Sequence, residues 1–148
     1  MTPYFDAGFL LTVLVHRPGS RVALETLSAF TPPFFLNFLH QLQVENFLAR
    51  GQVEGNDVER RAALQGNRLW RQYLSEGVFQ IGPVDWDTSC RLAINWNTHF
   101  APKAPPPPLL LIHPAMAAVA GTSHFLAFDP RSRGAAKAAG LKLLPERL

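Results

Sequence analysis

Three polar residues of this sequence stand where an expected strand is followed by an expected helix: Asp6, Asn37 and Asp129. Each follows a short apolar run typical of a buried strand and precedes a run typical of a helix. In a parallel sheet the carboxyl ends of the strands meet at one edge, where ligands bind. We therefore expect the two carboxylates and the amide to gather there, which makes that edge the candidate functional site.

A simpler interpretation of both acids stays open. Asp6 is equally suited to a turn in which it caps the first helix. Asp129 stands directly before Pro130, which is the pattern of an N-cap residue followed by proline at the first helical position. A capping carboxylate needs no ligand, so position alone does not separate the two roles.

The elements that must position these residues alternate between strand and helix. We expect strands at residues 4–5, 32–36, 78–81, 125–128 and 141–144, and helices at 9–15, 20–30, 38–48, 57–74, 86–98, 109–120 and from 130 onward. Pro114 is expected to break the helix at 109–120 or delay its start, and prolines make 102–108 a stiff connector. Ser20, Asn37, Asn56–Asp57 and Asp85 are expected N-caps. Strands separated by helices favour a mostly parallel sheet covered on both faces.

One helix is expected to be broadly apolar. The helix after Asn37 carries six large apolar residues that we expect on its buried face: Phe38, Leu39, Leu42, Val44, Phe47 and Leu48.

Composition bounds the class of protein. With 148 residues, 47% of them hydrophobic, the chain has enough apolar material for one domain and too much for a disordered chain. Its single cysteine, Cys90, excludes an internal disulfide and a four-cysteine zinc site and suits the reducing cytoplasm. No apolar run approaches the roughly 18 residues of a membrane span, and no signal peptide begins the sequence. We expect a cytoplasmic protein without a membrane partner.

Positive charge collects near the end of the chain. Fourteen basic and eleven acidic residues give a net charge of +3. From Pro130 onward, five basic residues face one acid. This segment is either a solvated helix face or a track for phosphates, with Arg131 and Arg133 as the candidate RNA contacts.

Three segments carry a resemblance to a known family. They are Leu-His-Gln-Leu-Gln-Val-Glu-Asn-Phe-Leu at 39–48, Ile-His-Pro-Ala-Met-Ala-Ala at 112–118, and a closing stretch that runs Phe-Leu-Ala-Phe-Asp-Pro-Arg-Ser-Arg at 125–133 and Ala-Gly-Leu-Lys-Leu-Leu-Pro at 139–145. With Asp6 after the first strand, they resemble the PIN domain, the fold of VapC-type toxins of bacterial toxin–antitoxin pairs and of other small ribonucleases. The resemblance spans residues 1–148 and implies a single α/β domain, a three-layer α/β/α sandwich with a short, mostly parallel central sheet.

The resemblance also implies a metal-dependent site. Active PIN domains hold one or two Mg²⁺ or Mn²⁺ ions with three or four carboxylates and activate water against an RNA phosphodiester. Asp6 matches the first acid and Asp129 the last. Gln43 stands where the family has glutamate, and Leu110 where it has aspartate. No acid occurs between Asp87 and Asp129, so the third acid is missing in any register.

The remaining reactive side chains are interpreted as structural. Glu45 lies about 200° around its helix from Gln43 and cannot replace the missing acid. The others are expected to cap, pack or form internal hydrogen bonds: His40, Trp70, Trp86, Cys90, Trp96 and His113. For Cys90 we expect a small buried residue.

These inferences lead to a PIN-like domain with an impaired nuclease site. The residual acids Asp6 and Asp129, with Gln43, would hold a divalent ion weakly, and binding of RNA or of a partner would remain. Expected partners are single-stranded RNA, an antitoxin-like protein or a second copy in a homodimer. The alternatives are an active Mg²⁺- or Mn²⁺-dependent ribonuclease of a toxin–antitoxin pair, and a scaffold that binds only proteins.

Overall fold

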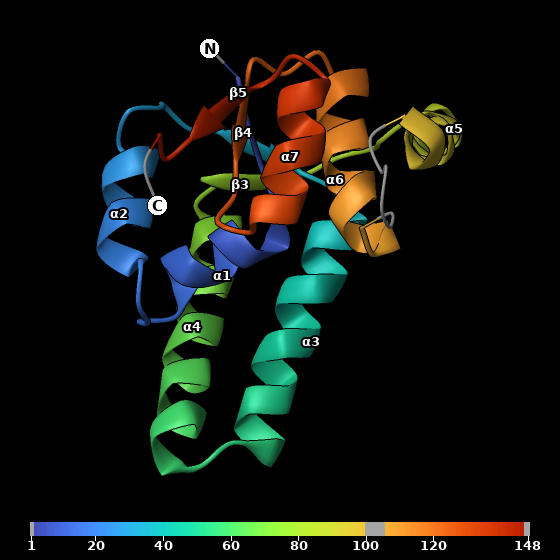
Figure 1. Ribbon diagram of the computed structural model, residues 1–148. Helices are drawn as coiled ribbons and strands as arrows, with labels where there is room; N and C mark the ends of the chain where they lie inside the picture. The colour runs from blue at the N-terminus through green and yellow to red at the C-terminus, as the bar shows by residue number, and fades with distance from the viewer. Residues whose placement is uncertain (1, 100–105, 147–148) are drawn as a thin grey trace. The chain divides into compact units, whose positions relative to one another are not determined.

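The computed structural model describes residues 2–99 and 106–146, which form seven helices and five strands, with one or two helices between successive strands (Figure 1). The strands are β1 (Pro3–Phe5), β2 (Phe34–Leu36), β3 (Phe79–Ile81), β4 (His124–Leu126) and β5 (Lys142–Leu144). The helices are α1 (Ala7–Leu14), α2 (Ser20–Leu27), α3 (Phe38–Glu54), α4 (Asp57–Ser75), α5 (Trp86–His99), α6 (Pro108–Val119) and α7 (Pro130–Ala138). The chain is therefore a mixed α/β protein, as the alternating pattern predicted.

Internal contacts divide the chain into two compact units. Unit 1 comprises Met1–Asp6 with Val84–Leu148, and unit 2 comprises Ala7–Pro83. Every strand pair is parallel, as expected, but the strands form two sheets, one in each unit. The single domain and the three-layer PIN-like sandwich stay predictions.

Unit 1 is built around the sheet β1-β4-β5. The register aligns Phe5 with Leu126 and Leu126 with Leu144, so β4 lies in the centre and all three of its residues are buried. Helices α5, α6 and α7 pack in sequence, and Trp96, Leu111 and Ala115 belong to their shared core. A buried central strand of this kind fixes where its carboxyl end delivers the following loop.

Helix α6 differs from the expectation at both of its prolines. Pro108 is the first residue of the helix, where a missing N–H costs nothing, and Pro114 lies inside an uninterrupted helix. The predicted break at Pro114 is wrong. The helix continues because the neighbours of Pro114 are buried on both sides, and their packing offsets the loss of one backbone hydrogen bond.

Unit 2 combines the parallel pair β2–β3 with a helical hairpin formed by α3 and α4 (Figure 1). Two glycines allow its helices to pack closely. A Cβ atom on Gly51 would lie 2.9 Å from the Cβ of Ala63, and one on Gly66 would lie 2.9 Å from Val15 and 3.0 Å from Leu48. These distances are shorter than real contacts, so side chains there would push the helices apart.

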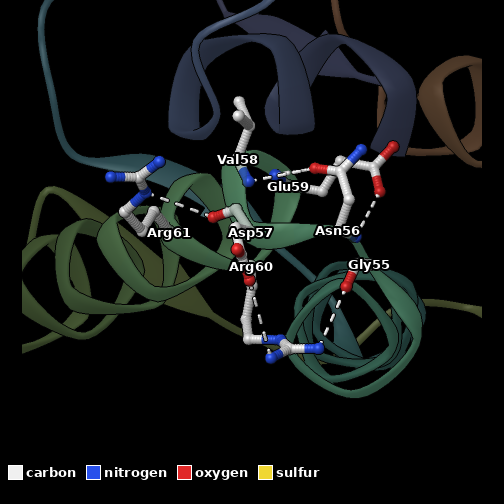
Figure 2. Close-up of polar contacts among 7 residues, drawn as sticks. All are labelled: Gly55, Asn56, Asp57, Val58, Glu59, Arg60 and Arg61. Carbon is white, nitrogen blue, oxygen red and sulfur yellow. Dashed lines mark hydrogen bonds and ion pairs between the residues drawn. The ribbon is translucent and has the colours of Figure 1, made fainter.

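Asparagine caps begin both long helices. The Asn37 side chain accepts from the N–H groups of Leu39 and His40. In the same way, Asn56 accepts from Val58 and Glu59, while the Glu59 carboxylate accepts the Asn56 N–H (Figure 2). Both predicted caps are confirmed, since each satisfies N–H groups that a helix start otherwise leaves unpaired.

The predicted cap at Ser20 is wrong. Gly19 occupies the N-cap position with φ of 93°, a left-handed conformation that favours glycine. The Ser20 hydroxyl instead accepts the Arg17 N–H and donates to the Thr12 carbonyl, which ties the loop back to α1.

The broad apolar face predicted for α3 is wrong in part. Val44 and Leu48 are buried, but Phe38, Leu42 and Phe47 are 67%, 66% and 42% exposed. The six apolar positions spread around more than half of the helix, whereas α3 buries only the stripe spaced by four residues. Phe38 and Leu42 therefore lie outside the stripe that α3 buries.

Cys90 is exposed, so its predicted burial is wrong. Helix α5 buries Ser89, Ala93 and Trp96, and Cys90 stands one position away from that stripe. Within residues 2–99 and 106–146, no helix has both the length and the apolar character needed to cross a membrane.

Candidate functional site

The carboxyl edge of the sheet in unit 1 brings two acids to the same side of the molecule. Asp6 follows β1, and its N–H donates to the Leu126 carbonyl over 3.0 Å, which extends the β1–β4 ladder by one residue. Asp129 comes three residues after β4. Because β1 and β4 are parallel neighbours, both acids belong to the edge at which the sequence placed them. Asp6 is buried there and Asp129 is half-buried.

Asp129 caps α7 and binds an arginine at the same time. Its Oδ1 accepts the backbone N–H of Arg131 at 2.8 Å and the Arg131 Nε at 3.2 Å, and its Oδ2 lies 2.9 Å from Arg131 Nη2. The capping interpretation is therefore confirmed. Hydrogen bonding from the Arg131 side chain is the main cause that lowers the pKa of Asp129, so the group is a carboxylate at neutral pH.

A second arginine, Arg133, interacts electrostatically with Asp6. Arg133 donates from Nη1 to the Ala127 carbonyl at 2.8 Å and from Nη2 to the Pro145 carbonyl at 2.9 Å. Partial burial lowers the pKa of Arg133, and the negative charge of Asp6 opposes that shift. Arg133 thereby ties the loop before α7 to the segment after β5.

The charges at this edge do not suit a bound divalent ion. The charge of Asp6 acts on the Arg133 guanidinium, and both oxygens of Asp129 already accept hydrogen bonds from Arg131. Mg²⁺ and Mn²⁺ favour sites where several carboxylates leave an excess of negative charge. Among the described residues, no group of three or more His, Cys, Asp or Glu side chains is arranged to hold a metal. The residues present thus fit a Mg²⁺ or Mn²⁺ site poorly.

Gln43 and Leu110, the substituted positions, belong to different units. Leu110 is half-buried on α6 in unit 1. Gln43 is half-buried on α3 in unit 2, where it lines a cavity of about 890 Å³. The convergence of Gln43 with the two acids stays a prediction.

The cavity beside Gln43 lies within unit 2, among α1, α3 and α4. Its walls combine the apolar side chains of Leu11, Phe47 and Val58 with polar groups. Arg17 is held across one end: Nη2 donates to the Gly8 carbonyl at 2.7 Å, and its guanidinium lies 5.8 Å from the centre of the Phe47 ring. A mixed lining of this kind suits a segment with apolar and polar side chains better than a metal ion.

The two candidate histidines have structural contacts. The His40 Nδ1 accepts the Asn37 N–H at 3.1 Å and completes the cap of α3. The His113 Nδ1 is 3.0 Å from the Tyr4 hydroxyl, in a buried contact. These contacts confirm the structural interpretation of both residues.

The tryptophans divide into two kinds. Trp70 and Trp96 are buried, which confirms their packing role, and the Trp70 indole also donates to Glu45 at 3.3 Å. Trp86 is 42% exposed, so it packs only in part. The hydrogen bond between Trp70 and Glu45 does not test whether Glu45 could replace the missing acid, so that prediction stays open.

Comparison with protein-family models, with curated proteins and with solved structures finds no match for this chain. The geometry of the residues themselves is therefore what supports any functional assignment.

Sequence reasoning missed one feature of this edge and one of unit 2. It assigned Arg131 to RNA, although an arginine two residues after an N-cap aspartate is well placed to bind that aspartate. It also passed over a stretch of α4 with four arginines and no acid, at residues 60–75, which the printed sequence shows directly.

Proposed function

We propose that this chain is a PIN-like domain whose metal-dependent ribonuclease site is impaired and whose remaining role is to bind. The observation that supports this most strongly is the pairing of Asp129 with Arg131 beside a second cation, Arg133, near Asp6. Two of the carboxylates that the PIN resemblance calls for are replaced by Gln43 and Leu110. Each lost carboxylate removes a ligand and a compensating negative charge.

The retained function is binding of a partner segment, and the cavity of unit 2 supports it. The cavity exposes Phe47 and Val58, which are 42% and 68% exposed, next to the polar side chains of Gln43 and Arg50. Burying such side chains stabilises a complex by about 25 cal/mol for each Å² of apolar surface. An antitoxin-like protein is the partner class that the PIN resemblance implies.

Thermal melting with and without metal tests the proposal. A ligand that binds only the folded state stabilises it by RT ln(1 + [L]/Kd), about 2.7 kcal/mol when its concentration is 100 times Kd. We expect 10 mM Mg²⁺ or 1 mM Mn²⁺ to leave the Tm of the wild-type chain within 1 °C or so of its value in EDTA. A Tm rise of several degrees that Asp6→Asn removes would favour the active ribonuclease instead.

Restoring the missing acids gives the reciprocal test. The double variant Gln43→Glu, Leu110→Asp should gain a Mn²⁺-dependent rise in Tm. A matched control adds the same two charges at exposed positions on the same two units, Gln65→Glu with Leu109→Asp, and should gain none. Equal behaviour of both double variants would count against a PIN-like arrangement of Gln43 and Leu110.

A further inference from the structure

The stretch of α4 from Arg60 to Ser75 is rich in positive charge. It contains four arginines and no aspartate or glutamate. Its charge of +4 exceeds the net charge of the whole chain, +3, because the other ten basic and eleven acidic residues leave the remainder at −1. It is one of two segments with a charge of +4, the other being the one from Pro130 onward, where five basic residues stand against one acid.

The four arginines share one face of α4. At 100° per residue, Arg60, Arg61, Arg68 and Arg71 fall within an arc of about 100° and span about 16 Å along the helix axis. All four side chains are exposed. We call these four residues the arginine stripe.

The stripe has an anchored end and an open end. At the anchored end, Arg60 Nη2 donates to the Gly55 carbonyl at 3.2 Å and Arg61 Nε donates to the Asp57 carbonyl at 3.2 Å (Figure 2). These bonds go to neutral carbonyls, so they orient the two guanidinium groups without adding a negative charge, although Arg60 also forms a long ion pair with Asp57. At the open end, Arg68 and Arg71 have no hydrogen bond or ion pair within the described part of the chain.

Acidic side chains flank the stripe and do not interrupt it. Asp57 lies at the helix start, 4.0 Å from Arg60, with its side chain 91% exposed. Glu59 belongs to the cap on another side of the helix, and Glu76 follows the helix and accepts from Gln72. From α3, Glu45 accepts the Trp70 indole N–H and lines a small hollow together with Arg71.

We propose that the arginine stripe binds the phosphate backbone of a nucleic acid. Guanidinium groups match phosphate oxygens in shape and charge, and a length of about 16 Å covers about five nucleotide steps of a helical strand. The aromatic side chain nearest the stripe in sequence, Trp70, is only 1% exposed, so it offers no stacking surface for bases. Binding should therefore depend strongly on salt and little on base sequence.

Two other classes of partner fit the stripe less well. A helix that lies on a membrane surface needs a broad apolar face, whereas among the arginines only Leu64 is both large and apolar, at 43% exposure. An acidic protein would be expected to bring apolar contacts as well. The proposal is independent of the PIN-like site, because it uses neither Asp6 nor Asp129.

Fluorescence anisotropy with a labelled 20-nucleotide single-stranded RNA, in EDTA, tests the proposal. With four phosphate contacts, log K should fall with log[KCl] with a slope of about −2.8, or roughly 50-fold between 50 and 200 mM. The variant Arg68→Gln, Arg71→Gln should lose about half of that slope and on the order of tenfold in affinity at 50 mM KCl. Duplex RNA and duplex DNA in parallel assays identify the form of nucleic acid that binds best.

The control removes the same charge elsewhere. Arg21→Gln with Arg91→Gln deletes two exposed helix arginines, each paired with an acid four residues away. This control should retain the wild-type affinity within about twofold. Equal losses in both variants, or no binding by the wild-type chain, would overturn the proposal. So would binding to vesicles containing phosphatidylserine that depends on Arg68 and Arg71 in the absence of binding to any nucleic acid. Circular dichroism and Tm establish that each variant is folded.

The RNA-binding assay contains EDTA, so its outcome does not depend on whether Mn²⁺ raises the Tm in the separate melting experiment. Failure of the stripe and failure of the impaired-nuclease proposal are therefore seen in different measurements.

Discussion

Two pairs of arginines in this protein have the same chemistry and opposite surroundings. At the carboxyl edge of the sheet in unit 1, Arg131 binds the Asp129 carboxylate and Arg133 donates to two backbone carbonyls. On α4 in unit 2, Arg68 and Arg71 are exposed and have no such partners in the part of the chain that the structure describes. The first pair holds loops in place, while the second is open to an external anion.

The difference shows why a count of charges predicts partners poorly. The C-terminal segment has more basic residues than acids, yet its two best-placed arginines are used internally. An arginine that satisfies carbonyls or a cap aspartate would have to break those bonds before binding a phosphate. The two regions differ in whether their guanidinium groups are available to bind an external anion, and not in their local net charge.

Removing Arg133 should produce the largest effect on stability. Arg133→Ala leaves the carbonyls of Ala127 and Pro145 without their donor and is expected to lower the free energy of unfolding by about 2–3 kcal/mol. Arg68→Ala should change it by less than about 0.5 kcal/mol, because the side chain is exposed and forms no ion pair with any described residue. Urea denaturation followed by circular dichroism measures both values. An equal loss of unfolding free energy in the two variants would contradict a structural role for Arg133 that Arg68 lacks.

Removing the Asp129 carboxylate should have a smaller effect that depends on pH. Asp129→Ala loses the cap of α7 and should cost about 1 kcal/mol, whereas Asp129→Asn keeps a capping oxygen and should cost less. Because the folded-state pKa of Asp129 is lowered, its carboxylate contributes stability above the unfolded pKa of about 4. That contribution is lost as the pH falls through the folded pKa.

Urea titrations from pH 7 to pH 2 test this assignment. The stability advantage of the wild-type chain over Asp129→Asn should shrink steadily below about pH 4. The exposed aspartate of α5, Asp87, supplies the control in the variant Asp87→Asn, which should differ little from the wild-type chain at any pH. An advantage over Asp129→Asn that is constant with pH would show that the ion pair with Arg131 adds nothing.

Much of the fold was predictable because local rules govern it. Short apolar runs located all five strands, and Asn37 and Asn56 begin helices as predicted. These features depend on a few adjacent residues, so sequence reports them directly. The position of both acids after parallel strands follows from the same rules.

The features that failed depend on contacts distant in sequence. Burial around Pro114 keeps α6 continuous, and α3 buries a narrower stripe than its composition suggests. Ser20 binds the end of α1 instead of capping α2, because Gly19 takes the left-handed cap position. In the candidate site, the sequence indicated Asp129 as the cap of α7 but not that Arg131 would bind both of its oxygens.

Removing Arg131 should have the smallest effect, on RNA affinity as well as on stability. It also compares the C-terminal arginines directly with those of α4. Its guanidinium already binds Asp129, so Arg131→Gln should change the affinity for single-stranded RNA by less than about twofold at 50 mM KCl. An exposed ion pair of this kind contributes at most about 1 kcal/mol to stability, so the variant should stay folded. Anisotropy with the same RNA measures the effect beside the Arg68→Gln, Arg71→Gln variant. If Arg131→Gln weakened RNA binding tenfold and the α4 variant did not, the C-terminal arginines would be the nucleic-acid contacts. The guanidinium bound to Asp129 would then have to leave it when RNA arrives.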